Sequence, residues 1–183
     1  DKNSITDMKN IFAIIGSASK NSSNEKLVAL IARQCSDTFK FTIFTDLKSL
    51  PHFDADETSD NPPNAITNFR ANIERADGIL ICTPEYVFSI PSGLKNAIEW
   101  CVATTVFSDK PTGLITASAG GQKGHEALQL IMKTVMTKFT DQTILLIQGI
   151  KGKINDQGQL TDKQTKDQLA SFIDAFKDLV YAS

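Results

Sequence analysis

The sequence contains few of the residues that mark special classes of protein. Its three cysteines, Cys35, Cys82 and Cys101, lie far apart and form no C-x-x-C pair. We therefore expect small core residues in a reducing compartment and no disulfide framework. The two histidines, His52 and His125, have no partners at metal-ligand spacing, so we expect both at the surface or in loops and no bound metal.

Excess positive charge and long apolar runs are also absent. The formal net charge of -2 excludes the basic face that nucleic acid requires. No apolar run approaches the roughly 20 residues of a membrane span, and no charged-then-apolar signal segment opens the chain. We expect a cytoplasmic protein that has neither nucleic acid nor a membrane as a partner.

The 183 residues are most simply one domain, 1–183, which is long enough for a full hydrophobic core. No repeat, low-complexity tract or second-domain boundary interrupts it. The polar start, residues 1–8, is expected to be a tag remnant or a frayed tail.

Short apolar runs alternate with amphipathic stretches along the whole chain. The runs predict buried strands at residues 10–16, 39–46, 77–83, 112–120 and 142–149. Helical spacing predicts helices at residues 22–35, 64–76, 91–105, 125–139 and 162–181. Ser22 with Glu25, and Thr161 with Gln164, provide capping signals for the first and last helices.

This alternation predicts an α/β fold in which a five-stranded parallel sheet lies between two layers of helices. Ligands of such sheets bind outside the carboxyl ends of the strands. The loops after the first, third and fourth strands are therefore the candidate functional segments.

The loop after the first strand, "GSASKNSSN" from Gly16 to Asn24, is dense in hydroxyl groups. Serine hydroxyls, backbone N–H groups and a helix N-terminus can bind the oxygens of a phosphate monoester. A helix cap in a serine-rich turn explains the same residues. Glu25 disfavours an anion here unless its carboxylate turns back to cap the backbone.

The other two loops are less specific when each is taken alone. In "TPEYVFSIP", Tyr86 is placed to close over a planar ligand, or the loop is a structural turn in which Glu85 pairs with Lys95. In "TASAGGQKG", small residues allow a backbone to approach a flat ring closely, or form an ordinary strand-to-helix turn. A phosphate cradle, an aromatic loop and a small-residue loop at one sheet edge together describe a flavin mononucleotide (FMN) site.

At these motifs the sequence resembles the NAD(P)H-dependent FMN reductases, including azoreductase-like and chromate/quinone-reductase-like members. "TPEYVFSIPSGLKNAIEW" is similar to the family's T-P-E-Y-N-x-S-I-P-x-x-L-K-N-A-I-D-W, and "GSASKNSSN" to its G-S-x-R-x-x-S-x-N. The resemblance extends over residues 10–180. It implies a flavodoxin-like fold with strand order 2-1-3-4-5 and non-covalently bound FMN.

The resemblance also implies a set of cofactor-binding residues. The phosphate is expected at Ser17, Ser22 and Asn24, with Ser19 at the position of the family's arginine. The isoalloxazine ring is expected to lie between two groups of residues: Pro84, Glu85, Tyr86 and Val87 on one edge, and Ser118, Gly120, Gly121 and Gln122 on the other.

Two departures from the family motif concern this site. Ser19 replaces the arginine, and a hydrogen bond to a charged group is worth roughly 1.5–3 kcal/mol. FMN is therefore expected to bind tenfold or more weakly unless Lys20 takes the arginine's place. Val87 replaces an asparagine and removes one polar side chain beside the ring.

The implied activity is transfer of hydride from NADPH or NADH to FMN, and then to a small acceptor such as a quinone, azo compound, metal oxyanion or free flavin. No catalytic side chain is expected, because the flavin carries the chemistry. A flavodoxin-type electron carrier and a binding module without turnover are the alternatives. The family implies a homodimer or homotetramer, with Phe88, Ile90, Val106 and Phe107 as interface candidates or as internal packing.

Overall fold

The computed structural model describes residues 7–183, so most of the expected tag or frayed tail lies outside the described residues. The strands are β1 (Lys9–Ile15), β2 (Phe39–Phe44), β3 (Gly78–Thr83), β4 (Thr112–Ser118) and β5 (Ile144–Gln148). The α-helices are α1 (Ser23–Gln34), α2 (Asn64–Arg75), α3 (Ser92–Glu99), α4 (Gln122–Thr134) and α5 (Lys163–Tyr181). Two 3-10 helices, η1 (Leu47–Ser49) and η2 (Ile150–Gly152), follow β2 and β5.

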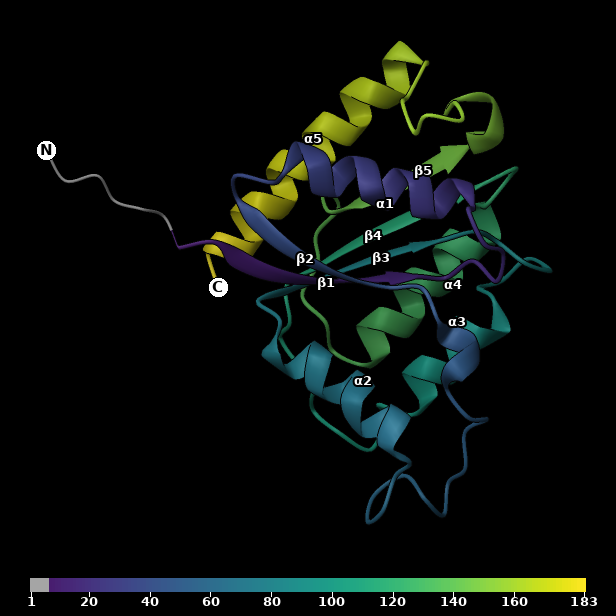
Figure 1. Cartoon of the computed structure of the whole chain (residues 1–183), viewed down its shortest axis with the longest axis vertical. Helices are drawn as coiled ribbons and strands as arrows, with labels where there is room; N and C mark the ends of the chain where they lie inside the picture. Colours follow the sequence, from purple (N-terminus) through teal and green to yellow (C-terminus); the bar gives the residue numbers. More distant parts are fainter. Residues whose placement is uncertain (1–6) are drawn as a thin grey trace, which may run out of the picture.

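The five strands form one sheet in the order β2-β1-β3-β4-β5, and every pair is parallel. This is the flavodoxin-like order, so the predicted fold class and topology are confirmed. Helices α1 and α5 cover one face of the sheet, and α2, α3 and α4 cover the other (Figure 1).

The central strands are apolar on both faces because helices cover both sides. Strand β3 is buried along its whole length. One hydrophobic cluster packs the sheet against α1 and α5 and includes Leu27 and Phe172. The other packs it against α2, α3 and α4 and includes Phe69 and Trp100.

The carboxyl ends of all five strands meet at one edge of the sheet, on the right in Figure 1, and the C-terminus lies on the opposite side. At this edge β1 and β3 approach very closely. Gly16 N–H donates to Cys82 C=O at 2.8 Å, and a Cβ on Gly16 would lie 2.2 Å from Thr83 Oγ1. The serine-rich loop starts at this close contact.

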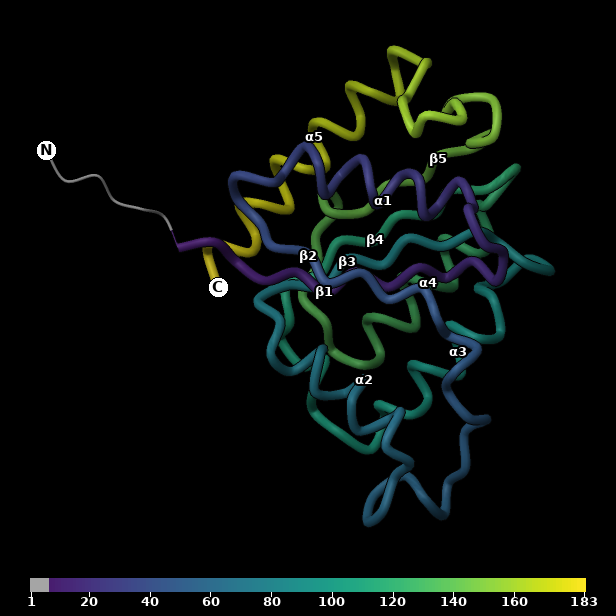
Figure 2. Tube along the Cα trace, in the orientation of Figure 1, coloured from purple at the N-terminus to yellow at the C-terminus, as the bar shows by residue number. Residues whose placement is uncertain are grey.

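The long loop after η1 is hydrogen-bonded to α3 and to the residue that follows it, and it does not cover the carboxyl edge of the sheet. Pro51 C=O accepts hydrogen bonds from Asn96 Nδ2 at 2.9 Å and Trp100 Nε1 at 2.8 Å. Arg70 bonds Thr58 C=O at 2.8 Å and reaches Trp100 C=O at 2.9 Å. In Figure 2 the loop hangs away from the carboxyl edge, beside α2 and α3.

The predicted boundaries differ from the structure at two helices. Helix α3 ends at Glu99, not near Thr105, because the chain after Trp100 continues as turns. Helix α4 begins at Gln122 and ends before Met136, whose φ of 65° cannot continue a right-handed helix.

The two predicted capping signals also have different outcomes. Ser22 Oγ accepts from Glu25 N–H at 3.2 Å, as predicted. The predicted cap of α5, Thr161, is wrong by one residue. Asp162 is the N-cap, and its Oδ2 accepts from Thr165 N–H at 2.9 Å, because a carboxylate is a stronger acceptor than the Thr161 hydroxyl.

Candidate functional site

A cavity of about 620 Å³ opens at the carboxyl edge, where the serine-rich loop faces the start of α3. Among the predicted site residues, Ser17, Ser19 and Tyr86 line it, and Lys20 lies beside them. Two other parts of the wall were not predicted from the sequence. These are the segment after β2, residues 45–48, and the start of α3, residues 91–93.

The serine-rich loop presents a set of unused hydrogen-bond donors. Within the part of the chain that the structure describes, no acceptor is found for the backbone N–H groups of Ser17, Lys20, Ser22, Ser23 and Asn24. The last of these groups belong to the N-terminus of α1, where the helix dipole favours negative charge. The donor set suits the terminal oxygens of a phosphate group.

The Glu25 carboxylate does not oppose this role. Its Oε2 accepts from Asn21 N–H at 3.2 Å, so the carboxylate turns back and caps the loop backbone. The condition under which a phosphate and Glu25 are compatible is therefore met.

The side chains of Ser22 and Asn24 form hydrogen bonds within the protein that stabilise the fold. The Ser22 hydroxyl caps α1. Asn24 is buried, donates from Nδ2 to Ala117 C=O at 3.2 Å and accepts at Oδ1 from Cys82 Sγ at 3.2 Å. Through these bonds Asn24 ties the start of α1 to the ends of β3 and β4, and its backbone N–H remains free for a ligand.

Tyr86 reaches the serine-rich loop through its hydroxyl group. Ala18 N–H donates to Tyr86 Oη at 3.3 Å, and Ser17 Oγ lies 3.5 Å from the same oxygen. The ring therefore connects the loop after β3 to the loop after β1, and its polar end lies among the donors described above.

Glu85 joins the loop after β3 to the loop after β4. Its Oε1 accepts from Gly121 N–H at 3.3 Å, its Oε2 accepts from Gly124 N–H at 2.7 Å, and its own N–H donates to Ser118 Oγ at 3.1 Å. The alternative pairing of Glu85 with Lys95 is wrong. Lys95 lies 3.5 Å from Glu99, one helical turn away, whereas Glu85 caps the N-terminus of α4.

The remaining predicted ring contacts lie outside the cavity wall but next to it in the fold. Pro84 is buried, and its C=O accepts from Thr83 Oγ1 at 2.9 Å. The N–H groups of Gly120 and Gln122 have no acceptor among residues 7–183. These two amides are available to the polar edge of a planar ligand.

Val87 and Phe88 occupy a strained two-residue turn at the tip of the loop after β3. Tyr86 and Ser89 exchange backbone hydrogen bonds of 2.9 and 3.0 Å, and the φ angles of Val87 and Phe88 are 49° and 58°. Such turns favour Asn and Gly, because a β-branched side chain at positive φ is unfavourable by about 1–2 kcal/mol. Val87 is also 96% exposed, so packing does not compensate for the strain.

We expect Val87→Asn to raise the free energy of unfolding by about 1 kcal/mol, because asparagine tolerates this backbone conformation. Thermal unfolding should show a melting temperature about 2–4 °C higher. Val102→Asn is the matched control, since Val102 is 66% exposed and its φ is not among the positive values. An equal gain in both variants would contradict the assigned strain.

His125 is buried in α4, contrary to the expected surface position, whereas His52 is exposed as expected. His125 lies on the inward face of α4, one turn before Leu128. Its Nδ1 is 2.7 Å from Thr116 Oγ1, and burial lowers the pKa of the imidazole.

This pKa shift predicts a pH-dependent stability. An unfolded histidine titrates near its ordinary pKa of about 6.5, so below that pH the unfolded state binds more protons than the folded state. The free energy of unfolding should therefore fall as the pH drops from about 7.5 to 5.5. His125→Gln should flatten the slope of melting temperature against pH, and a slope equal to that of the wild type would refute this.

The three cysteines are buried and unpaired, as expected for small core residues. Burial raises the pKa of the Cys101 thiol to about 12 and that of Cys82 still further, so both thiols remain protonated. Among residues 7–183 no group of three or more His, Cys, Asp or Glu side chains is placed to hold a metal ion, and no helix is both long and apolar enough to cross a membrane.

Comparisons with known proteins agree on one family. The model of the NADPH-dependent FMN reductase family matches residues 9–145. The chain is 30% identical over 172 residues to a 2-hydroxy-1,4-benzoquinone reductase of Burkholderia sp., covering 91% of this chain and 93% of that protein. It is 29% identical over 178 residues to a quinone reductase of Pseudomonas putida, covering 93% and 94%.

A solved structure shows the same fold at similar identity. The flavoenzyme NAD(P)H:(acceptor) oxidoreductase FerB from Paracoccus denitrificans superposes with a TM-score of 0.85 at 28% identity. The match covers 96% of this chain and 98% of FerB.

Proposed function

The chain belongs to the NADPH-dependent FMN reductase family and is an FMN-dependent NAD(P)H oxidoreductase, and we propose that it reduces small quinones. The relatives named as quinone reductases, which match this chain along nearly its whole length, support this acceptor. The flavodoxin-type carrier and the binding module are less well supported, because the matching family model describes a reductase and these relatives are named as reductases.

The observation that carries the assignment of the site is the donor set of the serine-rich loop. Its free backbone amides, together with Ser17, Ser19 and Lys20, are suited to hold the phosphate of FMN. The hydroxyl of Tyr86 lies among these donors, so we assign Tyr86 to the phosphate end of the cofactor as well as to the ring.

The other proposed residues support and orient the ring. Glu85 fixes the loop after β3 to the start of α4, and Ser118 adds a further bond between the same loops. Small side chains and backbone groups lie beside the ring at Pro84, Gly120, Gly121 and Gln122. Val87 lies at the exposed turn. FMN supplies the hydride-transfer chemistry when bound, and these residues bind it, orient it and offer N–H donors to its polar edge.

The proposed site lies within one FMN-binding domain that comprises the whole chain. Both hydrophobic clusters pack against the same sheet, which supports this division. We place the protein in the cytoplasm, and its unpaired, buried cysteines agree with a reducing compartment.

A homodimer or homotetramer is also proposed. Ile90 and Phe107 are buried inside the chain, so of the two alternatives given for them, internal packing applies and an interface does not. Phe88 at 77% and Leu130 at 68% exposure are better candidates for a contact between copies, because large apolar side chains at the surface favour association.

The experiment for the proposed activity follows the absorbance of the FMN-loaded protein. Under anaerobic conditions, NADPH or NADH should bleach the absorbance bands of the oxidised flavin. Addition of a stoichiometric amount of a quinone should then restore these bands. An azo dye and a metal oxyanion, tested in parallel, identify the better acceptor. Bleaching that no quinone reverses would overturn the proposed acceptor, and the absence of bleaching by either nicotinamide would overturn the reductase activity.

A further inference from the structure

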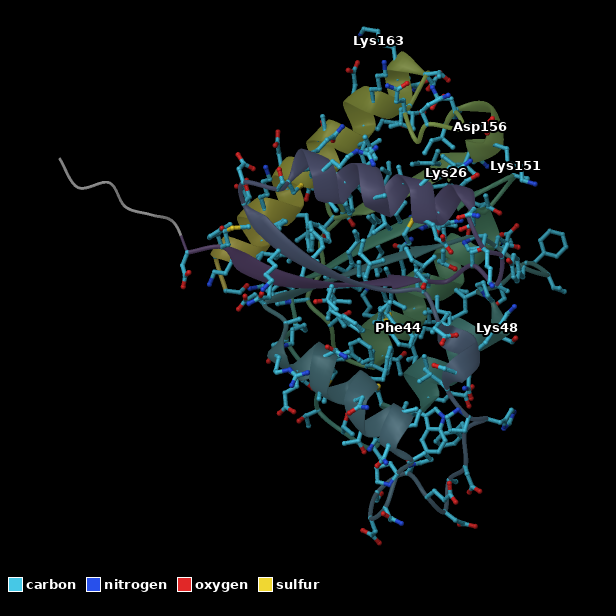
Figure 3. The ribbon with its side chains drawn as sticks, viewed as in Figure 1. Lys26, Phe44, Lys48, Lys151, Asp156 and Lys163 are labelled. Atoms are coloured by element: carbon cyan, nitrogen blue, oxygen red, sulfur yellow. The ribbon has the colours of Figure 1, made fainter. Side chains whose placement is uncertain are left out.

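The turn from β4 into α4 lies at the carboxyl edge of the sheet. Figure 3 shows Lys48, which follows β2, and Lys151, which follows β5, on the side of the molecule where the strands end. Strand β4 lies between β2 and β5 in the sheet, so its turn into α4 lies between these two lysines along the edge. The amides of Gly120 and Gln122, which have no acceptor among residues 7–183, belong to this turn. The contacts that fix the turn therefore decide where these two amides point.

One of these contacts is a buried polar pair between β4 and α4. Thr116 lies near the carboxyl end of β4 and His125 near the start of α4, and both side chains are buried. His125 Nδ1 lies 2.7 Å from Thr116 Oγ1. A neutral imidazole donates at one nitrogen and accepts at the other, and a hydroxyl group can do either. The two side chains therefore form a hydrogen bond in both tautomers of the histidine.

The Thr116 side chain also supports the turn itself. Gly121 is the N-cap of α4 with a φ of 101°, and a Cβ on it would lie 3.2 Å from Thr116 Cγ2 and 2.9 Å from Leu146 Cδ1. The backbone of Gly121 therefore packs directly on Thr116 and on the neighbouring residue of β5. His125 N–H donates to Gly121 C=O at 2.8 Å. Thr116, Gly121 and His125 thus each contact the other two.

The start of α4 is held from two sides as a result. From the loop after β3, Glu85 accepts hydrogen bonds from Gly121 N–H and Gly124 N–H. From the sheet, the bond between Thr116 and His125 fixes the distance between β4 and the first turn of α4. The loop that carries the open amides is therefore defined by directional bonds on both sides.

Stability alone does not require a polar pair at this position. Replacing both partners of a buried hydrogen bond by apolar groups of the same shape can be nearly neutral. A hydrogen bond differs from an apolar contact because it fixes both distance and direction. Groups that bind a ligand must be held within about 0.5 Å of the productive geometry. A hydrogen-bonded pair beneath the turn meets this requirement.

We propose that Thr116 and His125 are positioning residues for the flavin ring. Their hydrogen bond sets the position of the turn at Gly121 and so directs the amides of Gly120 and Gln122 toward the polar edge of the ring. Both side chains act through the backbone of this turn. The proposal rests on the proposed function, in which the loop after β4 borders the ring of FMN.

The first test uses the flavin-free protein. Thr116→Val removes the hydroxyl group and keeps the shape of the side chain, so hydrogen exchange at the Gly124 and His125 amides should become about tenfold faster. Thr112→Val is the matched control. Thr112 is also buried in β4, but its hydroxyl donates to Lys110 C=O at 2.8 Å at the opposite end of the strand. This variant should leave the two exchange rates unchanged.

Titration with FMN and riboflavin then locates the effect. Thr116→Val should raise the Kd of both flavins by the same factor, about tenfold, because the two ligands share the ring and differ only in the phosphate. Thr116→Ser keeps the hydroxyl group and should restore most of the affinity. An unchanged Kd for FMN in Thr116→Val, or a loss that is confined to FMN, would overturn the proposal.

The double variant Thr116→Val/His125→Leu separates positioning from stability. It leaves no buried polar atom of the pair without a partner, so its melting temperature should return close to that of the wild type. The Kd of FMN should stay about tenfold higher than in the wild type. Recovery of affinity together with stability would show a structural role only and overturn the proposal.

Failure of this proposal is distinguishable from failure of the proposed function. Unchanged amide exchange in Thr116→Val, with FMN still bound by the wild-type protein, would overturn the positioning role and leave the proposed function intact. Failure of the wild-type protein to bind FMN, with amide exchange still accelerated in Thr116→Val, would instead overturn the proposed flavin site.

Discussion

Gly16→Ala is expected to destabilise the protein by about 3 kcal/mol and to weaken FMN binding at least tenfold. A Cβ at this position would lie 2.2 Å from Thr83 Oγ1, 2.5 Å from Thr83 Cβ and 3.1 Å from Thr83 Cα. The methyl group therefore pushes the end of β1 away from β3, and Ser17 and the amides that follow it move with the strand. Chemical denaturation measures the loss of stability, and fluorescence titration measures the affinity for FMN.

Gly152→Ala is the matched control for this substitution. A Cβ on Gly152 has no atom within 4 Å, and its φ is not among the positive values. Thr83→Gly removes the two nearest clashing atoms, so the double variant Gly16→Ala/Thr83→Gly should be more stable than the sum of the two single effects predicts. Additive effects, or a Gly16→Ala protein as stable as the wild type, would show that this close contact does not set the geometry of the loop.

Glu85→Gln is expected to lower the free energy of unfolding by about 2–3 kcal/mol and to loosen the flavin site. The carboxylate accepts from Gly121 N–H and Gly124 N–H at the start of α4, and a hydrogen bond to a charged group is worth roughly 1.5–3 kcal/mol. Glutamine keeps one acceptor oxygen but turns an NH₂ group toward the second amide. The melting temperature should fall by about 5–10 °C.

Glu99→Gln separates this effect from a general loss of negative charge. Glu99 forms an exposed ion pair with Lys95 at 3.5 Å, and such pairs contribute about 0–1 kcal/mol. We expect its melting temperature to stay close to that of the wild type. If the two variants lost the same stability, the assigned cap of α4 would be incorrect.

The fold was predictable because each element carries its own local signal. The run from Gly78 to Thr83 is uniformly apolar, as a strand covered on both faces must be, and Ser22 marks the start of α1. The ends of α3 and α4 were less predictable, because Val102 after α3, and Val135 and Phe139 after α4, keep the helical spacing of apolar residues after the backbone has left the helix.

Part of the site was predictable for a topological reason. In a parallel sheet the loops after β1 and β3 meet at one edge, so Ser17 and Tyr86 were expected together although they are 69 residues apart. The segment after β2 was missed because Thr45 and Asp46 extend the alternating pattern and were included in the strand. The chain turns into η1 there, and Lys48 is brought to the cavity wall.

Individual hydrogen-bond partners were not predictable from the sequence. Asn24 bonds a carbonyl group 93 residues away and Glu85 bonds an amide 36 residues away, and no local pattern encodes either pair. The polar residues of a motif therefore divide into those that face the cavity and those that hold its walls together, and only the folded structure separates the two groups.

Binding of the FMN phosphate by the serine-rich loop is tested most directly by comparing FMN with riboflavin, which differs only by lacking the phosphate group. Both are titrated into the flavin-free protein, and quenching of flavin fluorescence is recorded. We predict saturable binding of one FMN per chain and at least about 100-fold weaker binding of riboflavin, because several charge-assisted hydrogen bonds of the serine-rich loop are lost. Equal affinities for the two flavins, or no saturable binding of FMN, would contradict the assignment of this loop to the phosphate.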